Sequence, residues 1–219
     1  IFALDFLEAS LILSSREDPD SQAEQFFLGR ILRIRNNYLP KKDIVNEKSK
    51  PAAIKEYIDK YVIGQEDAKM AISTAVYNHM KRMRNPEIAF PTDVVLLIGP
   101  SGCGKTEIMR RIKDVTDLPM VFTDVSSLGV SQTKGRHKED ILISLIDAAH
   151  GDIQKAQHGI VFMDEFDKLL VPAISSEGDD VHARVQGQLL TMLEGSDVEV
   201  KYKNSDITFN TSHVLFVLA

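Results

Sequence analysis

Cysteine is nearly absent from this chain of 219 residues, which contains only one, Cys103. A single thiol cannot form an intramolecular disulfide, and it cannot complete a zinc site built on cysteines. The composition therefore excludes disulfide-stapled domains and cysteine-ligated zinc domains. We expect Cys103 to be a small, buried structural residue and not a catalytic one.

Long hydrophobic runs and an excess of positive charge are missing as well. No apolar stretch approaches the roughly 18 residues that a transmembrane helix needs. Residues 1–8 carry acids where a signal peptide would carry Lys or Arg, and the net charge of −6 argues against a general nucleic-acid binder. We therefore expect a soluble cytoplasmic protein of one or two domains. Because the chain starts without methionine and stops in a predicted strand, we expect it to be either a fragment of a longer protein or an incompletely ordered chain.

The strongest motif is a glycine-rich loop that directly follows the apolar run 94–98. It consists of Gly99, Pro100, Ser101, Gly102, Cys103, Gly104, Lys105 and Thr106. The spacing G-x-x-x-x-G-K-T is that of a P-loop, whose successive backbone N–H groups hold phosphate oxygens. A helix that begins near Lys105 would add the positive end of its dipole. We expect the loop to bind ATP, with Lys105 on the β- and γ-phosphates and the Thr106 hydroxyl on Mg²⁺.

A second motif is the apolar run 160–163, which ends in the adjacent carboxylates Asp164 and Glu165. The carboxyl ends of parallel strands converge on a ligand crevice, so we expect Asp164 to hold the Mg²⁺ of Thr106. Alternate side chains of a strand point to opposite faces, so Glu165 would point the other way and polarise the attacking water as the catalytic residue. A solvent-facing acidic turn is the alternative. Taken with the P-loop, the pair predicts Mg²⁺-dependent ATP hydrolysis.

The rest of the chain alternates apolar strands with helical patterns. Strands are predicted at 94–98, 120–123, 160–164 and 214–218, and helices at 54–61, 66–83, 105–115, 139–149 and 181–193. This alternation is typical of an α/β fold whose parallel sheet is covered on both faces. A hairpin is expected before the last strand, with strands 198–202 and 207–210 around a turn at 203–206.

Residues 1–50 differ from the remainder in composition and spacing. Residues 1–13 are apolar at helix-like spacing, and 41–51 is polar and charged like a linker. We predict two regions: an N-terminal extension or accessory region with linker over 1–50, and a nucleotide-binding domain over 51–219, incomplete at its C-terminus.

Several segments resemble the AAA+ ATPases, within them the Clp/HslU group, and most closely the ClpX family. They are residues 61–65, 77–79, 81–82, 152–159, 164–168, 185–190 and 193–195. The resemblance covers about residues 50–219. It implies an AAA+ P-loop NTPase sheet flanked by helices, truncated after the fourth strand and preceded by a helical extension. It also implies that Val62 and Ile63 frame the adenine.

The same resemblance implies a homo-hexameric motor that couples ATP hydrolysis to protein unfolding, in some cases for a partner peptidase. The family grips polypeptide with an aromatic pore loop. The corresponding residues here are Gly135, Arg136, His137 and Lys138. An aromatic loop grips any side chain by shape, whereas a cationic loop would prefer acidic or phosphorylated chains. The alternative is that these residues are a solvated turn. The family's zinc module would need cysteines that residues 1–50 lack, and its arginine finger would lie beyond Ala219.

Two other interpretations stay open. A nucleotide-gated assembly or adaptor module would bind ATP without threading polypeptide, which the loop at 135–138 favours and Glu165 opposes. A DNA-remodelling motor would place the basic loop on the phosphate backbone, which the negative net charge opposes. We also expect slow hydrolysis from this stretch alone, because a neighbouring arginine can contribute ~10³–10⁵ in rate.

Overall fold

A computed structural model describes residues 11–12, 50–84, 94–128, 138–175 and 178–219. The chain divides into two compact units, residues 1–117 and 118–219. Among the described residues, no helix has both the length and the apolar character needed to cross a membrane.

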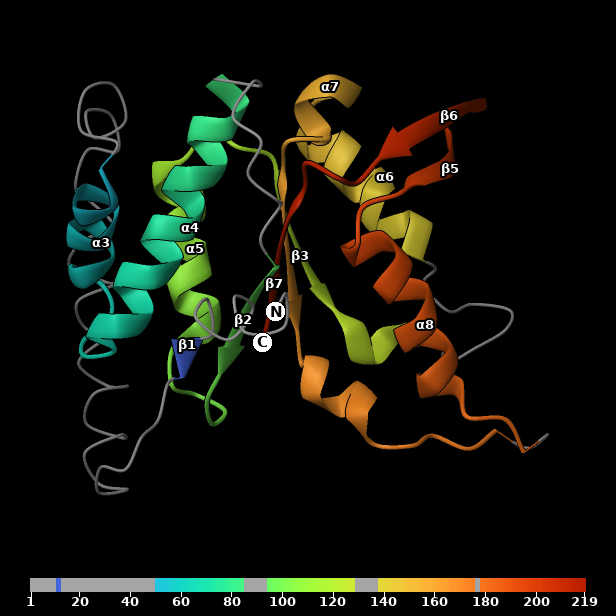
Figure 1. Ribbon diagram of the computed structural model, residues 1–219, viewed down its shortest axis with the longest axis horizontal. Helices are drawn as coiled ribbons and strands as arrows, with labels where there is room; N and C mark the ends of the chain where they lie inside the picture. Colours follow the sequence, from blue (N-terminus) through green and yellow to red (C-terminus); the bar gives the residue numbers. More distant parts are fainter. Residues whose placement is uncertain (1–10, 13–49, 85–93, 129–137, 176–177) are drawn as a thin grey trace, which may run out of the picture. The chain divides into compact units, whose positions relative to one another are not determined.

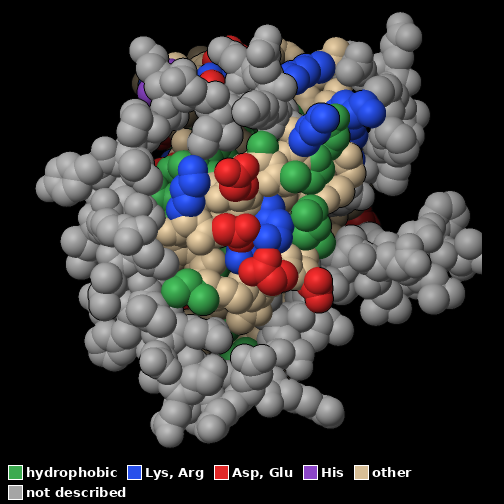
Figure 2. All heavy atoms as spheres, turned by 90° about the vertical axis from the view of Figure 1, so that its left-hand side faces the viewer, with side chains coloured by type: hydrophobic (Ala, Val, Ile, Leu, Met, Phe, Trp, Pro, Cys, Tyr) green, Lys and Arg blue, Asp and Glu red, His purple; other side chains and the backbone are tan. Residues whose placement is uncertain are grey.

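In its described residues, the first unit contains three helices and two paired strands. They are β1 (Leu11–Ile12), α3 (Pro51–Asp59), α4 (Glu66–Arg84), β2 (Val94–Ile98) and α5 (Lys105–Val115). β1 runs parallel to β2. Helix α3 packs against both α4 and α5 (Figure 1). Acidic and basic side chains lie next to one another on the side where α3 lies (Figure 2).

The core of the first unit follows the helical periodicity of its sequence. Pro51 opens α3, a position where its fixed φ suits a helix and its missing N–H costs nothing. The buried helix residues recur at intervals of three and four, as expected for one apolar face per helix. They are Ile54, Tyr57 and Ile58 in α3, Ala68, Ile72 and Val76 in α4, and Ile108, Met109 and Ile112 in α5.

The second unit contains a parallel three-stranded sheet in the order β7-β4-β3. Its elements are β3 (Met120–Asp124), η1 (Val125–Ser127), α6 (Lys138–Ala148), α7 (Ile153–Ala156), β4 (Ile160–Asp164), η2 (Phe166–Leu170), α8 (Val181–Leu193), β5 (Asp197–Tyr202), β6 (Ser205–Asn210) and β7 (Leu215–Leu218). Residues 160–163 of the central strand β4 are all fully buried. This is the burial expected for a parallel strand covered on both faces, so the α/β prediction is confirmed.

The predicted hairpin is present, but its turn is shorter than expected. In the antiparallel pair β5–β6, Tyr202 lies opposite Ser205, which leaves a two-residue loop of Lys203 and Asn204. Both loop residues have positive φ, 46° and 65°. That conformation gives a turn whose twist matches the two strands, and asparagine adopts it readily. The prediction of a four-residue turn at 203–206 was therefore wrong.

The N-terminal prediction is tested at only two positions. Leu11 and Ile12 form strand β1, where helix-like spacing predicted a helix, because backbone pairing with β2 outweighs the local pattern. The remainder of the predicted helical extension, and residues 135–137 of the cationic loop, lie outside the described residues. Lys138 is the first residue of α6.

Candidate functional site

The P-loop joins the end of β2 to the start of α5. Gly102 and Gly104 have φ values of 83° and 100°, a region that side-chain-bearing residues rarely adopt. Gly104 precedes α5 and carries no side-chain cap, so the first N–H groups of the helix face the loop. Ile108, Met109 and Ile112 are completely buried and fix the helix in place. The result is a rigid helix N-terminus suited to an anion.

The Lys105 ammonium lies over the loop. Its Nζ donates to the carbonyl oxygens of Gly99 at 2.7 Å and Pro100 at 3.2 Å. These carbonyls hold the positive charge where a phosphate bound by the loop would meet it. Thr106 lies in the first turn of α5, and the side chains of Lys105 and Thr106 are both half-buried.

Cys103 also lies within the loop, and its thiol is free and half-buried. The expectation of a buried structural cysteine was wrong in this respect. A residue in a loop that curls around a ligand site has no packed layer on its inner side, which explains the partial exposure.

A second segment of the first unit, residues 62–65, connects α3 to α4 beside the P-loop. A Cβ at Gly104 would lie 3.6 Å from Val62 Cγ1, so Val62 packs next to the start of α5. Val62 is buried and Ile63 half-buried. Gly64 and Gln65 both have positive φ, 74° and 60°. The two residues predicted to frame adenine thus lie on a tight turn next to the phosphate loop.

The acidic pair lies at the carboxyl end of β4 in the second unit. Asp164 ends the strand, and its Oδ1 accepts the Glu165 N–H at 3.1 Å. Glu165 lies outside the strand with φ of 59°, so the predicted alternation along the pleat was wrong at this residue. Such backbone conformations are costly for non-glycine residues and often occur at functional sites.

The Glu165 side chain is partly exposed and forms an ion pair with Lys168. The hydrogen bond from Lys168 to Glu165 raises the pKa of the lysine above its ordinary value. Lys168 and Glu165 are therefore held together as a pair, three residues apart in the chain.

Sequence analysis missed Asp124, which ends strand β3. It lies opposite Asp164 in the parallel register, so the two strands end in neighbouring carboxylates. Asp124 caps η1 by accepting the Ser126 N–H at 2.8 Å and the Ser126 hydroxyl at 2.6 Å. Ala219 completes this edge, since its N–H donates to Met163 and its carbonyl accepts from Phe166. An acid directly after a predicted strand was the available signal.

Thr106 and Asp164, the two residues predicted to hold Mg²⁺, belong to the first and the second unit respectively, and each carries an oxygen donor. Within the described parts of the chain, no group of three or more His, Cys, Asp and Glu is arranged to hold a metal alone. Mg²⁺ commonly takes one or two protein oxygens and completes its shell with phosphates and water. A threonine hydroxyl and an aspartate, Thr106 and Asp164, are donors of that kind.

Comparisons with known proteins find a family match whose range includes the P-loop and most of the strand before it. The model of the ATPase family associated with various cellular activities (AAA) matches residues 95–219. The ATP-dependent Clp protease ATP-binding subunit ClpX 2 of Wolinella succinogenes is 41% identical over 180 residues, covering 80% of this chain and 45% of that protein. ClpX of Treponema denticola is 37% identical over 186 residues, covering 76% and 43%. The chain spans less than half the length of these relatives.

Proposed function

The chain belongs to the AAA family of ATPases, and from that premise we propose that it is the nucleotide-binding part of a ClpX-like motor subunit that hydrolyses ATP. The observation that carries the proposal is the P-loop itself. Its left-handed glycines, uncapped helix start and overlying Lys105 ammonium form an anion site. The similar proteins are named ATP-binding subunits, which supports ATP as the ligand.

Each type of protein contact that phosphoryl transfer uses has a candidate residue in this chain. The loop amides and Lys105 bind the phosphates, Val62 and Ile63 contact the adenine, and Thr106 with Asp164 holds Mg²⁺. The ion supplies positive charge that offsets the charge developing on the transferred phosphate. Glu165 accepts a proton from the attacking water.

The ion pair between Glu165 and Lys168 sets a condition on this mechanism. A carboxylate acts as a general base only when it reaches the water it deprotonates. We propose that Lys168 holds Glu165 in a resting position and that nucleotide binding releases it. Until that release, the Glu165 side chain stays turned toward its partner Lys168.

We extend the proposal to the work that hydrolysis drives. The names of the relatives associate them with an ATP-dependent protease. We therefore propose a cytoplasmic homo-hexamer that unfolds protein substrates, with a partner peptidase and with an arginine supplied by the neighbouring subunit. A nucleotide-gated adaptor that binds ATP without threading is the second candidate, favoured by Arg136 and Lys138 in place of an aromatic loop.

Steady-state ATP turnover of the complete protein, with and without an unfolded polypeptide, tests both candidates. We expect turnover to rise with polypeptide, and Glu165→Gln to lower it by about 10²–10⁴ while ATP binding persists. Asp167→Asn, which removes a neighbouring carboxylate in η2, is the matched control and should retain turnover. Turnover that ignores polypeptide would favour the adaptor. Full activity in Glu165→Gln would exclude Glu165 as the base.

A further inference from the structure

A buried lysine lies behind the turn that connects α3 to α4. Lys69 belongs to α4, and its side chain is only 1% exposed. An ammonium group is costly to bury unless acceptors replace its water. The fold must therefore supply hydrogen-bond acceptors around the Lys69 ammonium group.

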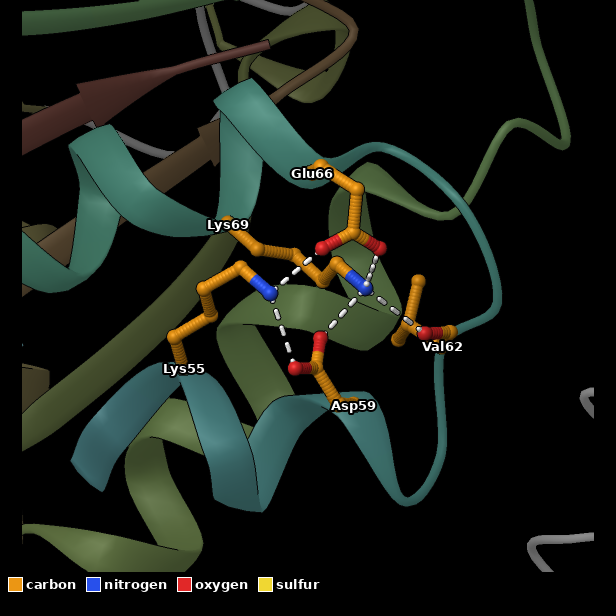
Figure 3. Close-up of polar contacts among 5 residues, drawn as sticks. All are labelled: Lys55, Asp59, Val62, Glu66 and Lys69. Atoms are coloured by element: carbon orange, nitrogen blue, oxygen red, sulfur yellow. Dashed lines mark hydrogen bonds and ion pairs between the residues drawn. The ribbon is translucent and has the colours of Figure 1, made fainter. Parts of the chain in front are cut away.

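Three acceptors surround Lys69 Nζ, as Figure 3 shows. It donates to the Val62 carbonyl oxygen at 3.2 Å and forms ion pairs with Glu66 at 2.8 Å and Asp59 at 2.5 Å. Three acceptors match the three N–H donors of an ammonium group. Asp59 ends α3, Glu66 begins α4, and Val62 lies on the turn between them. One side chain thus ties both helix ends to the turn.

A second lysine shares the same carboxylates. Lys55 forms ion pairs with Asp59 and Glu66 from the opposite side of the cluster (Figure 3). Hydrogen bonds from Lys55 and Lys69 lower the pKa of Glu66 below its ordinary value, so that its charge persists under neutral conditions. Lys69 differs from Lys55 in donating to the Val62 backbone as well.

The turn needs such anchoring because part of its backbone is unfavourable. Gln65 has φ of 60°, a conformation that costs free energy in residues other than glycine. On the other side of the turn, the Arg111 guanidinium lies over the Tyr61 ring, 4.4 Å from the centroid of that ring. Since Arg111 belongs to α5, the turn is held by Lys69 from α4 and by the helix that follows the P-loop.

We propose that Lys69 is a positioning residue for the nucleotide base. By holding the Val62 carbonyl, it fixes residues 62–65 against the start of α5 and so sets the geometry in which the turn meets the base. This inference rests on the proposed function, in which Val62 and Ile63 contact adenine. Lys69 contributes to recognition of the base and not to binding of the triphosphate, which belongs to the loop at 99–106.

The test compares a ligand with a base and a ligand without one. Affinities of the complete protein for Mg–ATP, Mg–GTP and inorganic tripolyphosphate are measured by calorimetry. We expect Lys69→Met to weaken ATP binding about tenfold, to reduce the preference for ATP over GTP, and to change tripolyphosphate affinity less than about twofold. A merely structural role would weaken all three ligands together.

Lys55→Met is the matched control. It removes an amine that pairs with the same two carboxylates and leaves the bond from Lys69 to Val62 in place, so the ATP to tripolyphosphate ratio should stay within about twofold of the wild type. Should Lys69→Met fail to fold, Asp59→Asn takes its place, because Asp59 is partly exposed and contacts Lys69 directly. We expect the same loss of base preference, about threefold.

The outcomes separate this inference from the function on which it rests. Wild-type protein that binds neither ATP nor tripolyphosphate would overturn the proposed function and this inference together. Wild-type protein that binds both, with an unchanged ratio in Lys69→Met or its substitute Asp59→Asn, would overturn the role of Lys69 alone.

Discussion

Two histidines stack against each other in the second unit, and their contact carries a pH dependence. The rings of His158 and His213 lie 5.2 Å apart, centroid to centroid. Burial, and secondarily the charge of His213, lower the pKa of His158 below its ordinary value of 6.5. The folded protein therefore favours neutral His158. The His158 side chain is half-buried just after the end of α7.

The sign of the effect follows from proton linkage. The unfolded chain binds a proton at His158 more readily than the folded protein does. The contribution of neutral His158 to folding stability is therefore fully present above about pH 6.5 and is lost as the pH falls through the lower pKa of the folded state. We expect the melting temperature to fall on acidification from about pH 7.5 to 5.5, and His158→Gln to flatten that dependence. Melting curves across this range provide the measurement. His150→Asn, at an exposed position with φ of 59° that asparagine tolerates, should leave the slope unchanged. If His158→Gln showed the wild-type dependence of melting temperature on pH, other titratable groups would be responsible for that dependence.

At the scale of elements, the start of α5 depends on a glycine for conformational and not for spatial reasons. A Cβ at Gly104 would meet Val62 at an ordinary contact distance of 3.6 Å, but φ is 100°. Gly187, in the interior of α8, has nothing within 4 Å of an added Cβ and no positive φ. The same substitution should therefore act in opposite directions at the two sites.

We expect Gly104→Ala to destabilise the protein by about 1–3 kcal/mol, the cost of a left-handed non-glycine residue. Gly187→Ala should stabilise it by about 0.5–1 kcal/mol, the difference in helix propensity. Urea unfolding of both variants measures these changes. If both variants changed the free energy of unfolding in the same direction, steric contacts or effects on the unfolded chain would dominate at one of the two sites.

The elements that sequence predicted well are those with an uninterrupted pattern. Strands β2 and β4 and helices α5 and α8 begin and end where their apolar runs and periodicity do. Boundaries failed where backbone conformation decides. Lys203 and Glu165 have positive φ without a sequence signal for it, because residues other than glycine, asparagine and aspartate rarely adopt that conformation unless the surroundings impose it.

For the candidate site, sequence identified the loop and the acidic pair but not their local contacts. A G-x-x-x-x-G-K-T spacing is specific because it combines a left-handed glycine, Gly104, with a lysine and a hydroxyl residue at the start of a helix. The Lys105 bonds to Gly99 and Pro100, the pairing of Glu165 with Lys168, and Asp124 in register with Asp164 depend on how side chains and strands come together. Single charged residues are too common along a chain to predict such contacts.

For the molecule as a whole, family membership and the chain's own contacts inform different parts of the site. The family match covers residues 95–219, which contain the phosphate loop and the acidic pair. The turn at 62–65 and Lys69 precede that range. The assignment of Val62 and Ile63 to the adenine comes from the family resemblance, whereas the positioning role proposed for Lys69 is argued from the packing of Val62 against the start of α5 and from the buried lysine. The part of the proposal that this chain's own contacts carry is therefore the anchoring of the turn.

Ligand binding should stabilise the whole molecule in a manner that depends on Mg²⁺. A ligand that binds only the folded state at 100 times its Kd adds about 2.7 kcal/mol, and a protein of this size gains roughly 2–4 °C in melting temperature per kcal/mol. We therefore expect Mg–ATP to raise the melting temperature of the complete protein by several degrees. Chelation of Mg²⁺ should remove part of that increase, because in the proposed function Thr106 and Asp164 contact the phosphates through the ion.

Thr106→Val isolates the hydroxyl while keeping the size of the side chain. We expect this variant to show a smaller Mg²⁺-dependent increase in melting temperature than the wild type, since the hydroxyl's share of the metal contact is gone. Thr191→Val provides the control, because that exposed hydroxyl on α8 contacts its own helix at Gly187. Thermal melts with ATP, with and without chelator, measure both. If Thr106→Val kept the full Mg²⁺-dependent increase, the ion would be held without Thr106, and the hydroxyl would have to be removed from the proposed site.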